Sequence, residues 1–190
     1  MSNIVGIDEV GRGCWAGPLL VVAARAKATL PEGLADSKAL TKKQRESLLE
    51  PIIESCELGE GWVQPEEIDN FGLAQAMRLG VTRALMDLGA SPEAEIILDG
   101  LVNYCSPEFV NVTTLVKADT LHSTVSAASI YAKVTRDAHM TRAAKFHPYY
   151  GFEKHVGYGT ELHRAALRIH GVSKLHRKSF KPVQQFLLPA

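Results

Sequence analysis

The sequence predicts a single α/β domain over residues 1–190, and three observations support this. The chain has 190 residues and 46% hydrophobic side chains, enough for one substantial core. Apolar, β-branched runs typical of strands are interspersed with segments of helical periodicity. We find no internal repeat, low-complexity tract or long linker that would divide the chain. Two small domains are the less favoured alternative.

Strands and helices of the first half have clear boundary signals. Thr41 is a typical N-cap for a helix of about a dozen residues that starts at Lys42. Pro65 and the acidic residues after it favour another helix start, because proline and carboxylates suit the positive end of the helix macrodipole. Gly89 closes a strongly periodic helix. The expected strands cover residues 4–10, 18–28 and 56–63, and the expected helices begin at Lys42, Pro65 and Leu73.

The second half predicts two more strands and a helical C-terminal part. Residues 94–100 form an apolar run that ends in Asp99 and Gly100, and residues 110–116 are β-branched. A long helix is expected over residues 125–145, followed by a loop over residues 153–159. Thr160 or a neighbour caps a short helix that Gly171 stops, and the segment 175–180 is basic and irregular.

Charge is distributed unevenly although the formal net charge is zero. Residues 1–116 hold 9 basic and 17 acidic side chains, whereas residues 117–190 hold 12 basic and 4 acidic ones and all seven histidines. A basic surface for phosphates together with an acidic cluster for cations would produce this split. Chance segregation of surface charge is the alternative.

Cysteine usage and hydropathy predict the compartment. Cys14, Cys56 and Cys105 are odd in number, widely spaced and form no CxxC pair, which favours buried thiols in a reducing environment. No run reaches transmembrane length, and the N-terminus lacks the features of a signal peptide. We therefore expect a cytoplasmic protein that does not bind a membrane.

Four carboxylates follow or close apolar strand-like runs: Asp8, Glu9, Asp99 and Asp119. Carboxylates that gather at strand ends repel one another, so they need divalent cations or raised pKa values to coexist. Oxygen ligands without partner Cys or His favour Mg²⁺ or Mn²⁺ over Zn²⁺, and two such ions could clamp the oxygens of a phosphodiester displacement. Taken singly, each acid could also be a solvated strand terminus.

Seven blocks in order make the sequence resemble the ribonuclease HII family over nearly the whole chain. The blocks are Gly6-Ile7-Asp8-Glu9-Val10-Gly11-Arg12-Gly13, Asp36-Ser37-Lys38, Leu98-Asp99-Gly100, Lys117-Ala118-Asp119, residues 126–137, His155-Val156-Gly157-Tyr158-Gly159-Thr160 and His176-Arg177-Lys178-Ser179-Phe180.

The resemblance implies an RNase H-like fold, in which a central mixed β-sheet is flanked by helices. It implies an endoribonuclease that cleaves the RNA strand of RNA/DNA hybrids and incises 5′ of ribonucleotides embedded in duplex DNA, as in ribonucleotide excision repair. Two Mn²⁺ or Mg²⁺ ions would leave 3′-hydroxyl and 5′-phosphate ends. The resemblance makes Asp8, Glu9, Asp99 and Asp119 the catalytic, metal-binding acids. It makes Gly11, Arg12 and Gly13 sensors of the 2′-hydroxyl at the RNA-to-DNA junction, and makes Tyr158 stack on the adjoining deoxyribose.

The residues themselves are consistent with these roles. The 2′-hydroxyl distinguishes RNA from DNA, and a Gly-X-Gly backbone can reach it without a Cβ in the way. Tyr158 lies between Gly157 and Gly159, where we expect an exposed turn, although a loop tyrosine that caps the core is the alternative. Lys38 either contacts a phosphate or is a solvated surface lysine.

The sequence departs from the family pattern at Ala118, Tyr131 and Val156, where Gly, Leu and Lys are frequent. The loss of a lysine at position 156 puts one phosphate contact in doubt, and Lys154 could partly replace it. On the long helix, Lys133 and Arg136 are expected to form a basic face for the nucleic-acid backbone.

Other features were assigned simpler roles. We expect surface positions or phosphate contacts for His155, His163 and His176, because their spacing matches no zinc site. Residues 184–188 faintly resemble short peptides that bind sliding clamps, a match that arises easily by chance. A monomer is expected. The alternatives to the hybrid-cleaving enzyme are a non-catalytic hybrid-binding module and another RNase H-like nuclease that acts on DNA junctions.

Overall fold

The structure, a computed structural model, describes residues 3–34 and 40–187. The chain divides into two compact units. The first unit comprises residues 1–10, 20–62 and 77–134, and the second comprises residues 11–19, 63–76 and 135–190. The single catalytic domain expected for residues 1–190 stays a prediction.

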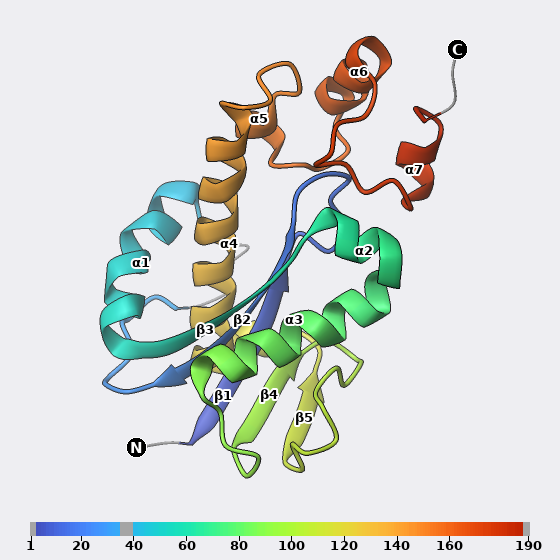
Figure 1. The fold of residues 1–190 in the computed structure, drawn as a ribbon. Coiled ribbons are helices and arrows are strands. Elements are labelled where there is room, and N and C mark those ends of the chain that lie inside the picture. Colours follow the sequence, from blue (N-terminus) through green and yellow to red (C-terminus); the bar gives the residue numbers. More distant parts are fainter. Residues whose placement is uncertain (1–2, 35–39, 188–190) are drawn as a thin grey trace. The chain divides into compact units, whose positions relative to one another are not determined.

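A five-stranded sheet forms the centre of the first unit, in the order β3-β2-β1-β4-β5 (Figure 1). β1 pairs antiparallel with β2 and parallel with β4, and β4 pairs parallel with β5, so the sheet is mixed as expected. The strands are β1 (Ile4–Val10), β2 (Leu19–Ala26), β3 (Cys56–Val63), β4 (Glu95–Asp99) and β5 (Val112–Leu115).

The N-terminal part of α4 (Ser123–Ala144) lies against one face of this sheet. A Cβ on Gly6 would come within 2.4 Å of the backbone of Thr124 and Val125, so only glycine permits this approach. Ala128 and Ala132 pack with Val22 and Ala24 of β2 in one buried cluster. The small side chains of residues 126–129 are therefore explained by close helix–sheet packing.

Two further helices complete the first unit. The capping box at Thr41 and Gln44 starts α1 (Lys42–Ser55), as the sequence predicts. The C-terminal part of α3 (Leu73–Leu88) contacts β3 so closely that a Cβ on Gly61 would lie 1.9 Å from the carbonyl oxygen of Gly80. Glycine in this strand is therefore a packing requirement.

Short helices and loops build the second unit around a core that includes Ala16, Met140, Tyr150, Phe152 and Leu167. The unit contains α2 (Pro65–Phe71), α5 (Phe152–His155), α6 (Glu161–His170) and α7 (Lys181–Gln184). Thr160 caps α6, and Gly171 ends it with a φ of 67°. The expected loop 153–159 is wrong in part, because its first residues form one helical turn, α5.

No helix in residues 3–34 or 40–187 combines the length and the hydropathy needed to cross a bilayer.

Candidate functional site

Asp8 and Asp99 lie side by side because of the parallel register between β1 and β4. Ile7 pairs with Leu98, so the next positions along the two strands are Asp8 and Asp99. Neighbouring strands lie about 4.8 Å apart, and residues in register direct their side chains to the same face. The sheet therefore brings together two of the predicted carboxylates.

That shared face is the one covered by α4. Asp8 pairs with Val22 of β2, and Val22 packs against Ala128 of α4. The side chain of Ser129, one position further along α4, hydrogen-bonds the Asp8 carboxyl group. Ser129 is thus a contact of the candidate site that sequence reasoning had assigned only to helix packing.

The electrostatics of Asp8 reflect its burial and its neighbouring acids. The pKa of Asp8 is raised from 3.8 to about 7, mainly by burial and also by the nearby charges of Glu9 and Asp99, and hydrogen bonds from Ser129 and the Glu9 backbone limit the rise. At neutral pH this carboxyl group is poised between its two protonation states. A bound cation would favour its ionised form.

Glu9 follows Asp8 in β1 and differs from it in the direction of its side chain. The ladder between β1 and β2 is regular through Val10, so the strand is undistorted at Glu9. Strand alternation then directs Glu9 and Asp8 to opposite faces of the sheet. Their charges nevertheless interact, because Glu9 contributes to the raised pKa of Asp8.

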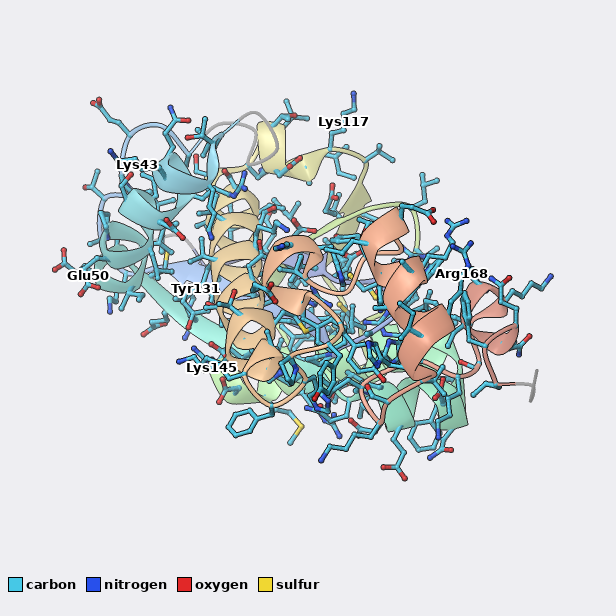
Figure 2. The ribbon with its side chains drawn as sticks, turned by 90° about the horizontal axis from the view of Figure 1, so that it is seen from above. Lys43, Glu50, Lys117, Tyr131, Lys145 and Arg168 are labelled. Atoms are coloured by element: carbon cyan, nitrogen blue, oxygen red, sulfur yellow. The ribbon has the colours of Figure 1, made fainter. Side chains whose placement is uncertain are left out.

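Asp119 is held by a loop that Asp99 itself anchors. The backbone N–H of Ala118 donates to Oδ1 of Asp99 at 2.8 Å, which ties the 3₁₀ turn η1 (Ala118–Thr120) to the end of β4. Asp119 is buried in this turn, whereas Lys117, with a φ of 59°, is exposed and labelled in Figure 2. The position of Asp119 therefore depends on the hydrogen bond that Asp99 accepts.

The donor set fits a hard divalent cation in its chemistry. Asp8, Asp99 and Asp119 offer carboxylate oxygens, which suit Mg²⁺ or Mn²⁺, and Glu9 would have to reach the same ion from the other side of β1. As the side chains stand, no three His, Cys, Asp or Glu residues in the described ranges already form a cage around an ion position. The register and the raised pKa of Asp8 support the site, and the ligand assignment stays a prediction.

In the second unit, two buried arginines shape the predicted Gly11–Gly13 loop. Arg177 donates from Nη1 to the carbonyl of Arg12 at 2.9 Å, and from Nε and Nη2 to the carbonyl of Gly17. Arg136 lies so close to Gly11, whose φ is 87°, that a Cβ there would be 2.2 Å from Nε. Gly13 is exposed, and its missing Cβ would meet nothing within 4 Å.

The turn that carries Tyr158 is joined to the same loop. The N–H of Trp15 donates to the carbonyl of Gly157 at 2.8 Å, and Arg136 donates to the carbonyl of Val156 at 3.0 Å. Tyr158 keeps 41% of its surface exposed, as the sequence predicts for this turn. The residues expected to select the substrate therefore occupy two hydrogen-bonded loops of one compact unit.

The prediction of a basic face from Lys133 and Arg136 is wrong for Arg136. Its side chain is 0% exposed, and besides Val156 it donates to the carbonyls of Pro18 at 2.8 Å and Ala16 at 3.2 Å. Three backbone acceptors satisfy the fork of a guanidinium without any anion. Arg136 therefore organises the loops and does not contact nucleic acid.

The surface positions predicted for His155, His163 and His176 are also wrong. All three are buried and stack among Tyr150, Phe152 and one another, with the rings of His155 and His163 4.4 Å apart. Burial lowers the pKa of His163 to about 4 and that of His176 to about 3. The signal that could have found His163 is its spacing from Ala166 and Leu167, which puts it on the apolar face of α6.

The positions that depart from the family pattern have local explanations. Ala118 is fully buried in a cluster with Ile97 and Val125, so its methyl group fills space. The hydroxyl of Tyr131 donates to Glu60 at 2.6 Å. Val156 adopts a φ of 45°, which is rare for a β-branched residue, and its carbonyl is held by Arg136. Lys38 lies outside the described residues.

Comparison with solved structures defines the class of protein. The chain matches the ribonuclease HII of a PCNA complex from Archaeoglobus fulgidus with a TM-score of 0.77 and 25% identity, covering 94% of this chain and 95% of that one. It matches ribonuclease H2 from Pyrococcus horikoshii with a TM-score of 0.74 and 25% identity, covering 96% of each chain. The fold is therefore RNase H-like, with helices flanking a mixed sheet.

Sequence comparison narrows the class to a family. The ribonuclease HII family profile matches residues 5–183. The ribonuclease HII of a Marinomonas species is 42% identical over 187 residues, which cover 97% of this chain and 92% of the relative. The chain belongs to the ribonuclease HII family, which confirms the resemblance seen in the sequence. It is a ribonuclease H, an endonuclease, so the non-catalytic module is set aside.

Proposed function

We propose that this ribonuclease H cleaves the RNA strand of RNA/DNA hybrids and incises 5′ of single ribonucleotides in duplex DNA, leaving 3′-hydroxyl and 5′-phosphate ends. The observation that carries the chemistry is that Asp8 and Asp99 directly follow the paired residues Ile7 and Leu98 on adjacent strands, where burial and the charges of Glu9 and Asp99 raise the pKa of Asp8. Ionisation of these neighbouring carboxylates is unfavourable without a cation. The site is therefore suited to bind cations that arrive together with a phosphodiester.

Asp8, Glu9, Asp99 and Asp119 would hold Mn²⁺ or Mg²⁺, with two ions in the site. When bound, the ions supply Lewis-acid stabilisation of the charge that develops on the scissile phosphate. Ser129 fixes the Asp8 carboxyl group by a hydrogen bond. The bond from Ala118 to Asp99 keeps η1, and with it Asp119, at the end of β4.

Substrate choice is assigned to the second unit. The exposed backbone at Gly13, where no neighbour lies within 4 Å of a Cβ position, can approach a 2′-hydroxyl closely. Tyr158 has an exposed ring that can stack on the adjoining deoxyribose. We propose that residues 1–190 act as one catalytic domain, in which the first unit cuts and the second unit selects. Lys38 is proposed as a phosphate contact.

The decisive experiment uses a DNA duplex that carries one ribonucleotide, incubated with the protein and Mg²⁺ or Mn²⁺. We expect a single cut on the 5′ side of the ribonucleotide and no cut in an all-DNA duplex. Asp8→Asn should abolish the cut while the duplex still binds. Cleavage of the all-DNA duplex at a similar rate would instead support a junction nuclease of another type.

Lys154 is proposed as a replacement for the phosphate contact that Val156 cannot make. Its side chain is exposed on α5, two residues before Val156. Lys154→Ala should weaken binding to an RNA/DNA hybrid severalfold and lower the salt dependence of the affinity. An unchanged affinity would remove Lys154 from the substrate surface.

We also propose a cytoplasmic monomer, with a sliding clamp as a weakly supported partner. Within the clamp-like segment, Phe186 packs against the core of the second unit. The structure from Archaeoglobus fulgidus is of a complex with PCNA, which is a property of that protein. Light scattering and co-elution with a purified sliding clamp would test both statements.

A further inference from the structure

Three buried histidines in the second unit form hydrogen bonds whose directions fix every ring proton. The N–H of Ser173 donates to Nδ1 of His176 at 2.9 Å, so this nitrogen carries no proton. Nε2 of His176 is then the protonated nitrogen, and it faces Nε2 of His163 at 2.9 Å. His163 must accept there, which leaves its own proton on Nδ1.

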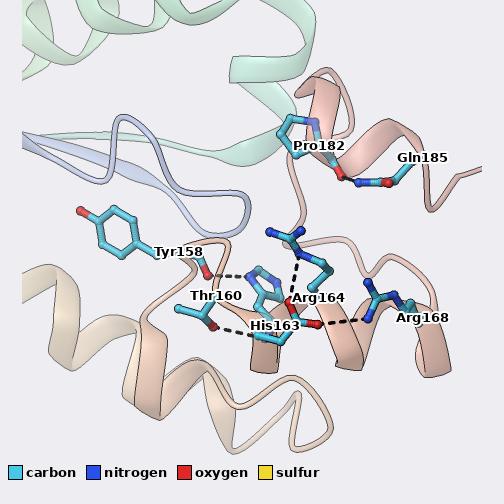
Figure 3. Close-up of polar contacts among 8 residues, drawn as sticks. Tyr158, Thr160, His163, Arg164, Arg168, Pro182 and Gln185 are labelled. Atoms are coloured by element: carbon cyan, nitrogen blue, oxygen red, sulfur yellow. Dashed lines mark hydrogen bonds and ion pairs between the residues drawn. The ribbon is translucent and has the colours of Figure 1, made fainter.

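Nδ1 of His163 ends this chain of hydrogen bonds on the Tyr158 turn. It lies 3.0 Å from the backbone carbonyl of Tyr158 and donates to it. Figure 3 shows this contact together with the bond from the His163 N–H to Thr160, which caps α6. The ring of Tyr158 extends away from His163, so the histidine holds the backbone of Tyr158 and not its ring.

His155 supports the other side of the same turn. The N–H of Gly157 donates to Nδ1 of His155 at 3.2 Å, so Nε2 of His155 is protonated and donates to the carbonyl of Tyr150 at 2.7 Å. The N–H of Tyr158 donates to the carbonyl of His155 at 2.9 Å. The backbone of Tyr158 is therefore held through both its N–H and its C=O.

The network has no place for an additional proton. A second proton on His163 would put two N–H groups against each other across 2.9 Å, and a second proton on Nδ1 of His176 would face the N–H of Ser173 at 2.9 Å. Burial lowers the pKa of both rings far below neutrality, so both are uncharged at pH 7. Uncharged rings with fixed tautomers give hydrogen bonds of fixed direction, which is what precise orientation of a turn requires.

We infer that His163 and His176 are positioning residues, which set the orientation of Tyr158 through the chain Ser173–His176–His163–Tyr158 carbonyl. This rests on the proposed stacking role of Tyr158. Neither histidine touches the nucleic acid in this assignment. Their effect on cleavage passes through Tyr158, and it therefore vanishes when the Tyr158 ring is removed.

Two substitutions separate the two ends of His163. The amide nitrogen of Asn can occupy the place of Nδ1, so His163→Asn can keep the bond to Tyr158 while it loses His176. The longer side chain of Gln reaches the place of Nε2, so His163→Gln can keep His176 while it loses Tyr158. His170→Gln, at an exposed position on the same helix, is the matched control.

The experiment measures kcat and KM for the full-length protein on a DNA duplex with one ribonucleotide, with Mn²⁺, in wild-type and Tyr158→Ala backgrounds. His163→Gln should lower kcat/KM about tenfold in the wild-type background, as expected for a lost positioning hydrogen bond, and less than about twofold in the Tyr158→Ala background. His163→Asn should lose less than His163→Gln, and His170→Gln should match the parent.

Equal losses for His163→Gln in both backgrounds would overturn the inference, because they would show that the histidine acts on the fold and not through Tyr158. If Tyr158→Ala alone leaves cleavage unchanged, the proposed role of Tyr158 fails instead. Nitrogen-15 NMR of the wild-type protein tests the relay without any variant. It should report the proton on Nδ1 of His163 and on Nε2 of His155 and His176, and any other tautomer overturns the relay.

Discussion

The two compact units bury ionisable groups in opposite ways. In the second unit, Arg136 and Arg177 are 0% exposed, yet their guanidinium groups are satisfied by backbone carbonyls of the same unit. In the first unit, Asp8 is buried beside other carboxylates, and its pKa rises to about 7. The two buried arginines have fixed acceptors within their own unit, whereas Asp8 needs a proton or a cation to offset its surroundings.

This contrast shows how to separate a structural charge from a functional one. A buried charge whose hydrogen-bonding groups all meet fixed partners rigidifies the surrounding loops. A buried charge that is opposed by its neighbours stores unfavourable energy until a ligand arrives. The sign of the neighbouring charges distinguishes the two cases more clearly than burial does.

The largest expected effect comes from Asp8→Asn. Cleavage should fall at least about a hundredfold, because a metal-binding oxygen is lost. At pH 8 the metal-free protein should become more stable by up to about 4 kcal/mol, because the variant lacks the carboxylate whose pKa is raised to about 7. Activity assays and denaturant titrations measure both, with the exposed Glu95→Gln of β4 as control. If Asp8→Asn were less stable than the wild type, the buried charge of Asp8 would not be unfavourable in the folded state.

Arg136→Lys should come second, with a loss of about 3 kcal/mol in the free energy of unfolding. A lysine ammonium cannot reach the carbonyls of Pro18, Ala16 and Val156 at once. The exposed Arg142→Lys on the same helix should change stability by less than about 0.5 kcal/mol. Chemical denaturation measures the difference, and similar losses for both variants would show that burial of the guanidinium is unimportant.

The stabilities of the two units should change in opposite directions as the pH falls. Folded His163 and His176 stay neutral down to pH values of about 4 and about 3, as their lowered pKa values require, whereas the unfolded chain binds their protons below 6.5. The stability of the second unit therefore falls as the pH decreases from 6.5.

In the metal-free protein, the contribution of Asp8 to stability depends on pH in the opposite sense to that of the histidines. Its folded carboxyl group keeps a proton up to about pH 7, the value to which its pKa is raised, whereas the unfolded chain releases that proton above 3.8. Its contribution therefore favours the folded first unit as the pH falls through this window. Hydrogen exchange between pH 7.5 and 5.5 should show weaker protection at the Tyr158 turn and stronger protection in β1. If protection at the Tyr158 turn and in β1 changed in the same direction with pH, the opposite pH dependence of the two units would be refuted.

The smallest effect on stability is expected for Gly13→Ala. A Cβ at this position meets no neighbour within 4 Å, so the free energy of unfolding should change by less than about 0.5 kcal/mol. Selectivity for the embedded ribonucleotide should nevertheless fall, because the methyl group obstructs the 2′-hydroxyl. Gly11→Ala, where Arg136 occupies the space, should instead unfold more easily. Equal stability losses would contradict this reading of the loop.

Local signals in the sequence predicted most of the fold and the positions of the candidate acids along the strands. The capping box at Thr41, the glycine after α6 and the apolar runs that end in Asp8 and Asp99 each act over a few residues. The pairing of Asp8 with Asp99 follows once β1 and β4 are parallel neighbours, because register is set by the strands themselves.

The roles of Arg136 and His163 could not be predicted in the same way. Each depends on backbone carbonyls supplied by distant segments, such as Pro18 for Arg136 and Tyr158 for His163. A polar side chain in a helix is compatible with solvent until those acceptors are known. The sequence pattern therefore indicated basic surface residues where the structure has buried side chains that donate hydrogen bonds to loop carbonyls.

The bond between Asp99 and the N–H of Ala118 has a consequence for the design of inactive enzymes. Asp99 also supports the turn that carries Asp119. A substitution at Asp99 therefore disturbs two acids at once, and its phenotype cannot be attributed to one. For an inactive protein that still captures its substrate intact, Asp8→Asn is the cleaner choice, since the support of η1 is then preserved.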